Sequence, residues 1–370
     1  MMVTSTLDFS AYIVDHTKDF TGRKWVFVEI DRWLADRYGP RFFIITGPPG
    51  KGKSAIAARL TEISNLAAYH FCIARQAETV DPFSFIRSLS HQLIRFYDFA
   101  SILADQRIEP QVTIDIQAGY GQVLAAEIES LTFQGPSPAI AFAHAVSSTL
   151  RAIVERGFDQ PLVILVDALD EALKYNGDET IIDLLANVAD LPTQVRFVLT
   201  SRPDQAVLRR FDLGPVVQLA LDSREDMNSL DIRHYMYQNA TLQPLYERVV
   251  AHNMHFFVQR VVTASEGNFL YVIWLLLAIP ADVQPIEALG ELPSGLDGIF
   301  RELLAQTVGR HIESWHRYKI LLGILAVAQE PLTPWQLAKF AHMSVNEVRD
   351  LLDVLRQFKF LWQSDDRYNL

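Results

Sequence analysis

A glycine-rich stretch from Gly47 to Ser54 has the residue types and the spacing of a phosphate-binding loop. It reads Gly-Pro-Pro-Gly-Lys-Gly-Lys-Ser and matches the pattern G-x-x-x-x-G-K-[ST]. Glycines let such a loop wrap so that its backbone N–H groups converge on phosphate oxygens, and the following helix adds the positive end of its dipole. Lys53 would reach the β- and γ-phosphates of ATP, and the Ser54 hydroxyl would bind Mg²⁺. The predicted nucleotide-binding residues here are Gly47, Pro48, Pro49, Gly50, Lys51, Gly52, Lys53, Ser54 and Ala55.

The alternative interpretation of this stretch is a chance glycine turn in front of a helix. The apolar run Phe42–Thr46 before the loop and the amphipathic pattern after it argue against that alternative, because they supply the strand–loop–helix order that a phosphate loop requires.

Carboxylates follow a second apolar run, Leu162–Asp167. Because ligands collect at the carboxyl ends of parallel strands, Asp167 would lie beside the phosphate loop and hold Mg²⁺ through water. Asp170 and Glu171 come just after it, and either could orient a water molecule for attack on the γ-phosphate. The alternative is a strand that ends in an acidic helix start, which is common because acids favour first turns. The phosphate loop upstream favours the catalytic interpretation and leaves open which of the two residues is the base.

A third stretch, Phe197–Asp204, predicts a strand that ends in Thr200, Ser201 and Arg202. If this strand neighbours the one that carries Asp167, its end faces the γ-phosphate, whose charge an arginine reads bidentately. The alternative is a surface arginine in a Ser-Arg-Pro turn. We therefore count Arg202 with Asp170 and Glu171 as the predicted catalytic residues, and Ser54 with Asp167 as the predicted metal ligands.

The elements that position these residues alternate between short apolar runs and helical patterns. That alternation is typical of an α/β fold with a parallel sheet whose strands are buried on both faces. We expect an inserted β-hairpin within Pro110–Phe133 and a helix over Pro138–Val154. The predicted strands are Arg41–Thr46, Ala67–Ile73, Leu162–Asp167, Val195–Thr200 and Val216–Leu219.

After Arg224 few segments have the pattern of a strand, and most have that of a helix. A Pro/Gly-rich joint interrupts this helical pattern over Pro280–Gly298. Three helices followed by a two-stranded wing end the chain, which predicts a helical domain and then a winged helix. The predicted helices are Arg224–Asn239, Leu245–Ala264, Asn268–Ala278, Tyr318–Gln329, Thr333–Phe340 and Ser344–Gln357, and the predicted wing strands are Phe360–Gln363 and Tyr368–Leu370.

Composition excludes several classes of protein. With 370 residues, 49% of them hydrophobic, general disorder is excluded, and a net charge of −11 argues against a protein that coats nucleic acid or an anionic membrane. The single cysteine, Cys72, cannot form an internal disulfide, which indicates a reducing compartment. The most apolar run, Asn268–Pro280, is shorter than the ~20 residues of a membrane span. We therefore expect a cytoplasmic protein without a membrane partner.

These motifs in this order resemble the STAND class of P-loop NTPases, in particular its NACHT-type members. The resemblance rests first on the phosphate loop, on Asp-Ala-Leu-Asp-Glu-Ala from Asp167 and on Thr-Ser-Arg-Pro-Asp from Thr200. Phe20–Trp25 is similar to the family's F-x-G-R-E-W segment, although Lys24 stands where glutamate is usual. Further similar stretches are His70–Cys72, Asp81–Pro82, Ser88–Leu93, Asp231–Tyr235, Gly267–Tyr271 and Leu292–Asp297.

The resemblance implies roles and boundaries that the residues alone do not. It implies that the backbone of Thr21, Gly22 and Arg23 contacts adenine, and that the protein binds ATP or ADP with Mg²⁺ and hydrolyses ATP slowly. It also implies a nucleotide-controlled conformational switch that self-associates on activation, in prokaryotic immunity or cell-death signalling. The implied domains are a lead segment at residues 1–19, a nucleotide-binding domain at 20–222, a helical domain at 223–312 and a winged helix at 313–370.

Two departures from the family pattern stand out. Ala168 follows Asp167 where AAA+ ATPases carry the catalytic glutamate, which is why the base is sought at Asp170 or Glu171. The chain also stops about where the family's winged helix presents a histidine that senses the ADP β-phosphate, and His342 lies too early for that role. No effector or sensor domain is visible in the sequence, and we therefore expect a switch core that is cut out of, or shortened from, a larger protein, with a truncated winged helix.

Two rival functions remain open. One is an AAA+-like ATPase that acts on nucleic acid, but the candidate recognition helix Ser344–Gln357 is net acidic, which disfavours a phosphate-lined groove. The other is a nucleotide-locked scaffold that binds ADP without turnover.

Overall fold

The computed structural model of the protein describes residues 7–74, 76–96, 112–117, 127–133, 137–212, 214–240, 254–278, 292–299, 301, 315–328, 330–357, 361–364 and 367–369. The chain forms two compact units. The first unit comprises Met1–Phe20, Lys24–Pro48 and Lys53–Leu221, and the second comprises Thr21–Arg23, Pro49–Gly52 and Asp222–Leu370. The four domain ranges expected from the sequence stay predictions.

A parallel sheet is the centre of the first unit. Its five strands lie in the order β2-β5-β6-β1-β7, and all the neighbouring pairs are parallel. The strands are β1 (Phe42–Thr46), β2 (Ala68–Phe71), β5 (Leu162–Asp167), β6 (Val195–Ser201) and β7 (Val216–Ala220). Every residue of β5 and β6 is buried, as the continuous apolar runs predict. The predicted strands are therefore confirmed, with shifts of one or two residues at their ends.

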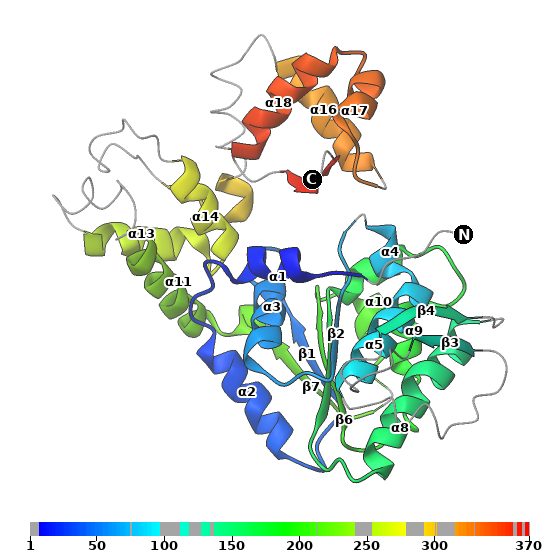
Figure 1. Ribbon diagram of the computed structural model, residues 1–370. Helices are drawn as coiled ribbons and strands as arrows, with labels where there is room; N and C mark the ends of the chain where they lie inside the picture. Colours follow the sequence, from blue (N-terminus) through cyan, green and yellow to red (C-terminus); the bar gives the residue numbers. More distant parts are fainter. Residues whose placement is uncertain are drawn as a thin grey trace. The chain divides into compact units, whose positions relative to one another are not determined.

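Helices cover both faces of this sheet because alternate strand residues point to opposite sides (Figure 1). Ile44, Ile164 and Phe197 pack in one core with α5, α8 and α9, whereas Phe43 and Val198 pack in the other with α1, α2 and α3. The helices of the first unit are α1 (Ser10–Thr17), α2 (Lys24–Ala35), α3 (Lys53–Ile63), α4 (Ala77–Val80), α5 (Pro82–Phe96), α7 (Pro138–Phe142), η1 (Ala143–Ser147), α8 (Ser148–Glu155), η2 (Leu169–Lys174), α9 (Ile181–Ala186), α10 (Gln205–Leu208) and η3 (Leu221–Ser223), the last of which extends into the second unit.

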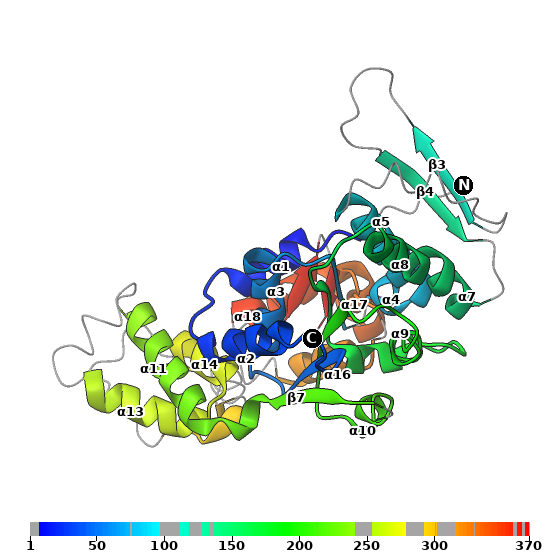
Figure 2. The same cartoon turned by 90° about the horizontal axis from the view of Figure 1, so that it is seen from below.

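The predicted hairpin is confirmed. Strands β3 (Val112–Gln117) and β4 (Glu127–Phe133) pair antiparallel as a separate two-stranded ribbon (Figure 2). The residues between the two strands, 118–126, lie outside the described residues.

The helix predicted over Pro138–Val154 is not a regular α-helix. It contains the π-helical turn η1 between α7 and α8. The Ser148 hydroxyl donates a hydrogen bond to the Ala143 carbonyl five residues earlier (2.9 Å), a spacing that suits the wider π-turn. A hydrophobic periodicity does not reveal a hydrogen bond of this kind, so the sequence pattern predicted one continuous helix.

In the described ranges, the second unit is helical apart from one small two-stranded ribbon. Its helices are α11 (Glu225–Ala240), α13 (Met254–Ser265), α14 (Phe269–Ala278), α16 (Trp315–Val327), α17 (Pro334–Ala341) and α18 (Val345–Gln357), and its strands are β8 (Trp362–Ser364) and β9 (Arg367–Asn369). One apolar core joins residues of these elements, among them Met236, Val261, Tyr271 and Leu355. The three last helices and the antiparallel strands appear in the predicted order. The first part of the helix predicted over Leu245–Ala264 and most of the joint lie outside the described residues. None of the helices in the described ranges combines the length and the hydropathy that a membrane span requires.

Candidate nucleotide-binding site

The phosphate loop follows β1 and leads directly into α3, as predicted. Strand β1 is apolar and buried, and α3 begins at Lys53 and is held by the buried Ile56 and Leu60. The Lys53 ammonium group donates hydrogen bonds to the carbonyls of Gly47 (2.5 Å) and Pro48 (3.1 Å), so its side chain curls back over the start of the loop. Lys53 thus lies over the ring of backbone groups in which a phosphate would be bound.

Asp167 lies at the carboxyl end of β5 and is completely buried. Its Oδ1 accepts a hydrogen bond from the Thr200 hydroxyl, whereas its Oδ2 has no hydrogen-bond partner among the described residues. Burial raises the pKa of Asp167 above its ordinary value, and the Thr200 and Ser54 hydroxyls act in the opposite direction. A buried carboxylate oxygen without a partner beside a serine hydroxyl suits a hard cation such as Mg²⁺, which takes few protein ligands and keeps water or phosphate oxygens. These residues therefore fit the expected metal.

Thr200 has a positioning role that the sequence pattern did not reveal. Ala168, directly after Asp167, has φ 55°, a left-handed conformation that costs a non-glycine residue about 1–2 kcal/mol. The Ala168 N–H donates to the Thr200 hydroxyl (2.9 Å), and that hydroxyl donates to Asp167. One threonine on β6 thus fixes both the strained turn and the carboxylate.

The predicted catalytic residues come together beside this turn. Asp170 and Glu171 lie on the 3-10 helix η2, and Arg202 follows β6, the strand next to β5. Arg202 Nε lies 3.1 Å from Asp170 Oδ2, its Nη2 lies 3.0 Å from Glu171 Oε1, and its backbone N–H donates to Asp170 Oδ1 (2.9 Å). Lys174 also pairs with Glu171. The two carboxylates are nearly buried, so two cations compensate their desolvation.

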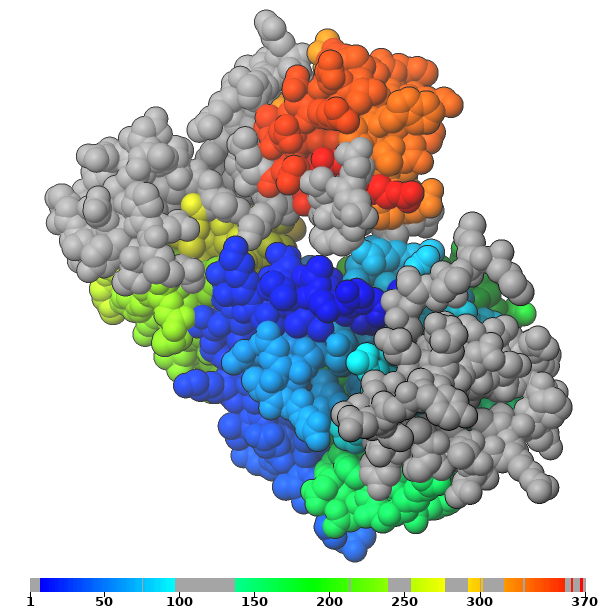
Figure 3. Space-filling view, in the orientation of Figure 1, coloured from blue at the N-terminus to red at the C-terminus, as the bar shows by residue number. Residues whose placement is uncertain are grey.

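Tyr12 of α1 is a neighbour of the metal ligands that sequence reasoning missed. Helix α1 packs on α3, and Figure 3 shows their surfaces side by side in two shades of blue. The Tyr12 ring lies 5.1 Å from the Phe71 ring, and its hydroxyl interacts with Ser54 and Asp167. Burial, followed by the negative charge of Asp167, raises the pKa of Tyr12 well above its ordinary value. No local motif marks such a residue, because the contact is made through the fold.

The tip of the phosphate loop belongs to the second unit, together with Thr21–Arg23. Within that unit the Thr21 hydroxyl donates to Gln238 Oε1 (2.5 Å), and Arg23 is almost completely buried. Arg23 contacts the loop through the Lys51 carbonyl, to which it donates a hydrogen bond (2.6 Å). The adenine contact expected of the backbone of Thr21–Arg23 stays a prediction.

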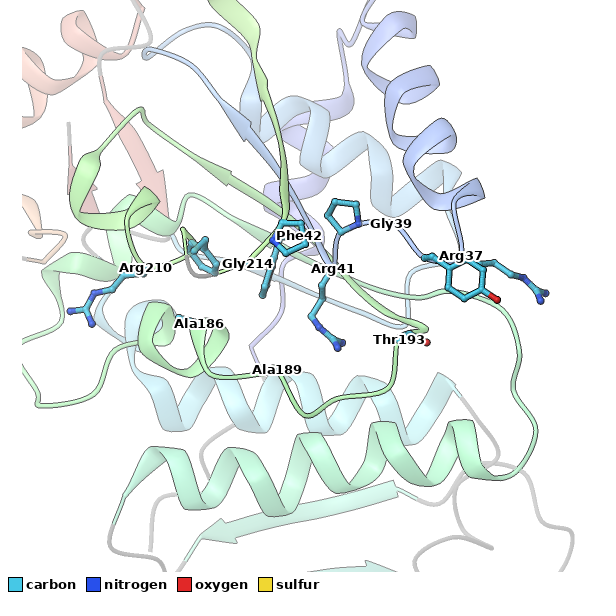
Figure 4. Close-up of a pocket in the computed structure, with 13 residues that line it drawn as sticks. Arg37, Gly39, Arg41, Phe42, Ala186, Ala189, Thr193, Arg210 and Gly214 are labelled. Atoms are coloured by element: carbon cyan, nitrogen blue, oxygen red, sulfur yellow. The ribbon is translucent and has the colours of Figure 1, made fainter.

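A pocket of about 360 Å³ lies elsewhere, at the amino end of β1. Figure 4 shows Arg37 and Arg210 on opposite sides of it, with Arg41 between them. The Arg41 guanidinium donates to the carbonyls of Leu191, Pro192 and Val195, and Arg210 pairs with Asp183. These arginines thus hold loops at the edge opposite to Asp167, and we do not count the pocket as part of the nucleotide site. The described residues contain no cluster of three or more metal-ligating His, Cys, Asp or Glu side chains.

Comparison with known proteins supports this assignment over part of the chain. Residues 23–202, just under half of the chain, match the family model described as Nephrocystin 3, N-terminal. No curated protein matches the chain.

Three solved structures have similar chains at low identity. A STAND ATPase with a tetratricopeptide repeat sensor from Pyrococcus horikoshii shares 13% identity at a TM-score of 0.44; the match covers 95% of this chain and only 41% of that protein. A RuvB variant from Thermotoga maritima shares 12% identity at a TM-score of 0.30, over 97% of this chain and 95% of that one. A chain of the Drosophila origin recognition complex bound to DNA shares 13% identity at a TM-score of 0.33; the match covers 97% of this chain and 93% of that one.

The phosphate loop between β1 and α3, the parallel sheet with Asp167 at its carboxyl edge and the family match over these elements agree with one another. Residues 23–202 therefore have the fold and the motifs of a P-loop NTPase and match the Nephrocystin 3, N-terminal family model.

Proposed function

We propose that the protein is an ATP- and ADP-binding switch that uses Mg²⁺ and hydrolyses ATP slowly. The observation that carries this proposal is the buried Asp167 Oδ2, which has no partner among the described residues and lies beside Ser54 of the phosphate loop. Leaving a buried carboxylate oxygen without a partner costs about 1–3 kcal/mol or more, a cost that a bound cation would remove.

The residues of the site have separate parts in this proposal. Lys53 would neutralise phosphate charge, and Ser54 and Asp167 would hold the cation, which when bound offsets charge on the phosphates. Asp170 or Glu171 would accept the proton of a water molecule that attacks the γ-phosphate. Both are paired with Arg202 in the structure, so that water can be engaged only if this pairing is rearranged. This requirement supports slow turnover.

Conformational switching is a further part of the proposal, and it rests on the family resemblance. Self-association on activation, and a role in immunity or cell death, remain parts of the proposal that only the family resemblance supports.

The first experiment is to denature the purified protein and identify any released nucleotide by chromatography, beside the Lys53→Ala variant. Stoichiometric ADP or ATP in the wild type and none in the variant is the expected result. A wild type that carries no nucleotide and does not bind added Mg-ATP would overturn the proposal. Bound ADP without turnover above the variant would replace the switch with a nucleotide-locked scaffold.

Turnover is tested next with Asp170→Asn and Glu171→Gln, which keep size and remove the negative charge. Loss of ATP hydrolysis in one of them, with ATP binding retained, identifies the base. Lys174→Met is the matched control, because it removes a partner of Glu171 without touching either carboxylate.

A further inference from the structure

Three consecutive carbonyls at the tip of the phosphate loop, those of Pro49–Lys51, each accept a hydrogen bond from a residue of the second unit. The donors are a side-chain amide, a backbone N–H at a helix start and a guanidinium group. They are Asn268 Nδ2 to Pro49 O (2.9 Å), Phe269 N to Gly50 O (3.1 Å) and Arg23 Nη2 to Lys51 O (2.6 Å). Lys51 adds a fourth bond by donating from Nζ to the Glu266 carbonyl (2.6 Å).

These bonds fix the orientation of the loop's own donors. In a trans peptide the carbonyl of one residue and the N–H of the next point in opposite directions. Carbonyls of Pro49, Gly50 and Lys51 that point toward Asn268, Phe269 and Arg23 therefore direct the N–H groups of Gly50, Lys51 and Gly52 away from them. These N–H groups are the ones with which a phosphate loop binds its ligand.

Asn268 uses both ends of its amide. Its Oδ1 accepts from the backbone N–H groups of Leu270 (3.0 Å) and Tyr271 (3.3 Å) and so caps α14, while its Nδ2 holds the Pro49 carbonyl. Gly50 has φ 79°, and a Cβ atom there would overlap the Asn268 amide. Only glycine therefore lets the loop approach this side chain so closely.

Several contacts also hold the Arg23 side chain in place. Its guanidinium lies over the Phe269 ring (4.9 Å to the centroid), 3.8 Å from Asp231, and donates to Asn228. Burial lowers the pKa of Arg23 to about 10, which still leaves it charged at neutral pH. The Lys51 carbonyl is thus held by a donor that has little freedom to move.

We propose that Asn268 and Arg23 are positioning residues that hold the tip of the phosphate loop in its phosphate-binding conformation. This inference rests on the proposed nucleotide binding. It adds that residues of the second unit set the affinity of the loop for phosphates. A change in the Gly267–Phe269 turn would then alter nucleotide affinity without touching the nucleotide.

The test uses Asn268→Asp. Aspartate caps a helix as well as asparagine does, so the cap of α14 is kept, but the donor to Pro49 O is replaced by an acceptor. We expect ADP affinity to fall about tenfold or more, the effect of a lost hydrogen bond with an unpaired carbonyl. The melting temperature without nucleotide should stay within a few degrees, while the rise caused by a fixed ADP concentration should shrink.

Asn187→Asp is the matched control. The Asn187 amide also donates to a carbonyl, that of Asp183 (2.9 Å), at an exposed helix end of the first unit, so the substitution has the same chemistry without the loop contact. It should leave ADP affinity unchanged. If Asn268→Asp binds ADP as the wild type does, the positioning role is wrong although nucleotide binding stands; if the wild type itself fails to bind, the proposed function is wrong.

Arg23→Lys provides a second variant in case Asn268→Asp does not fold. Lysine keeps the positive charge near Asp231 but cannot serve the Lys51 carbonyl and Asn228 together, since it lacks the planar fork of arginine. A ligand-free melting temperature near that of the wild type with about tenfold weaker ADP binding is expected. Unchanged ADP affinity in this variant would equally overturn the proposal.

Discussion

Two parts of the candidate site differ in how their polar groups are satisfied. At the tip of the phosphate loop the carbonyls of Pro49–Lys51 all have hydrogen-bond donors. At the end of β5, Asp167 Oδ2 is buried without a partner among the described residues, and so is the Ser201 hydroxyl on the neighbouring strand. The carbonyls of the loop tip are thus satisfied by protein donors, whereas the proposed cation would complete the surroundings of Asp167 Oδ2. A loss of binding without any loss of stability is therefore expected most clearly at the second part.

Asp167→Asn should show the largest difference between the effect on nucleotide binding and the effect on stability. The amide is the same size and can still accept from Thr200, so the free energy of unfolding should not fall, because a costly buried charge is removed. Mg²⁺-dependent nucleotide binding should fall about a hundredfold or more, since a neutral oxygen replaces the charged ligand. Denaturant unfolding and ADP titration with and without Mg²⁺ measure the two effects. Equal losses in stability and binding would mean that Asp167 is a structural residue, and the exposed Asp190→Asn serves as the control.

The buried ring of His70 tests whether a polar atom without a hydrogen-bond partner always belongs to a functional site. This fully buried histidine has Nε2 at 2.7 Å from the Thr79 carbonyl and Nδ1 without a hydrogen-bond partner among the described residues, and burial lowers its pKa to about 4. The unfolded chain, with an ordinary histidine pKa of about 6.5, binds more protons between pH 6.5 and 4, so stability is present above pH 6.5 and is lost as the pH falls toward 4.

The expected loss is up to about 3 kcal/mol, and His70→Gln should remove most of this pH dependence while nucleotide binding at pH 7.5 is retained. Urea unfolding at a series of pH values checks the prediction. A variant with the same pH profile as the wild type would assign the dependence to other groups.

Alanine substitutions at Gly50 and Gly52 test how strongly the Asn268 contact constrains the phosphate loop. Gly50 (φ 79°) and Gly52 (φ 85°) share a left-handed backbone, but only at Gly50 would a Cβ atom meet another side chain. Gly52→Ala should cost about 1–2 kcal/mol of ligand-free stability from backbone strain. Gly50→Ala should cost about 1–2 kcal/mol more, since Asn268 must move. Equal costs in thermal unfolding would show that the Asn268 contact does not constrain the loop.

The smallest effect is expected for Tyr12→Phe, which removes one hydroxyl from the neighbourhood of Ser54 and Asp167. Because that hydroxyl competes with a cation for the same two residues, Mg²⁺-dependent ADP affinity should rise by about three- to tenfold. Tyr38→Phe, at a fully exposed tyrosine, is the control. Weaker binding in Tyr12→Phe would indicate instead that the hydroxyl assists the ligand.

The sequence was most informative where the chemistry is local. The phosphate loop, Asp167 at a strand end and the neighbouring strand followed by Arg202 were all indicated by short motifs and apolar runs. The ion pairs of Arg202 with Asp170 and Glu171 were not predicted. The sequence did not reveal the contacts of Tyr12, Thr200 and Asn268. Asn268 and Pro49 are 219 residues apart, and no periodicity encodes which backbone group an amide will meet. The π-turn in the Pro138–Val154 segment was missed for a similar reason, since the hydrogen bond from Ser148 to the Ala143 carbonyl leaves no mark in the hydrophobic pattern.

The two units are interleaved along the chain, which passes between them after Phe20, Arg23, Pro48, Gly52 and Leu221. A cut by a protease at any one of these places would leave the two units connected through the crossings that remain. Expressing residues 222–370 alone would leave out Arg23 and Lys51, so Asn228 and Asp231 would each lose their contact with Arg23. A simple truncation would therefore yield a fragment without the contacts that the two short segments make, and a linker that carries both segments would keep them.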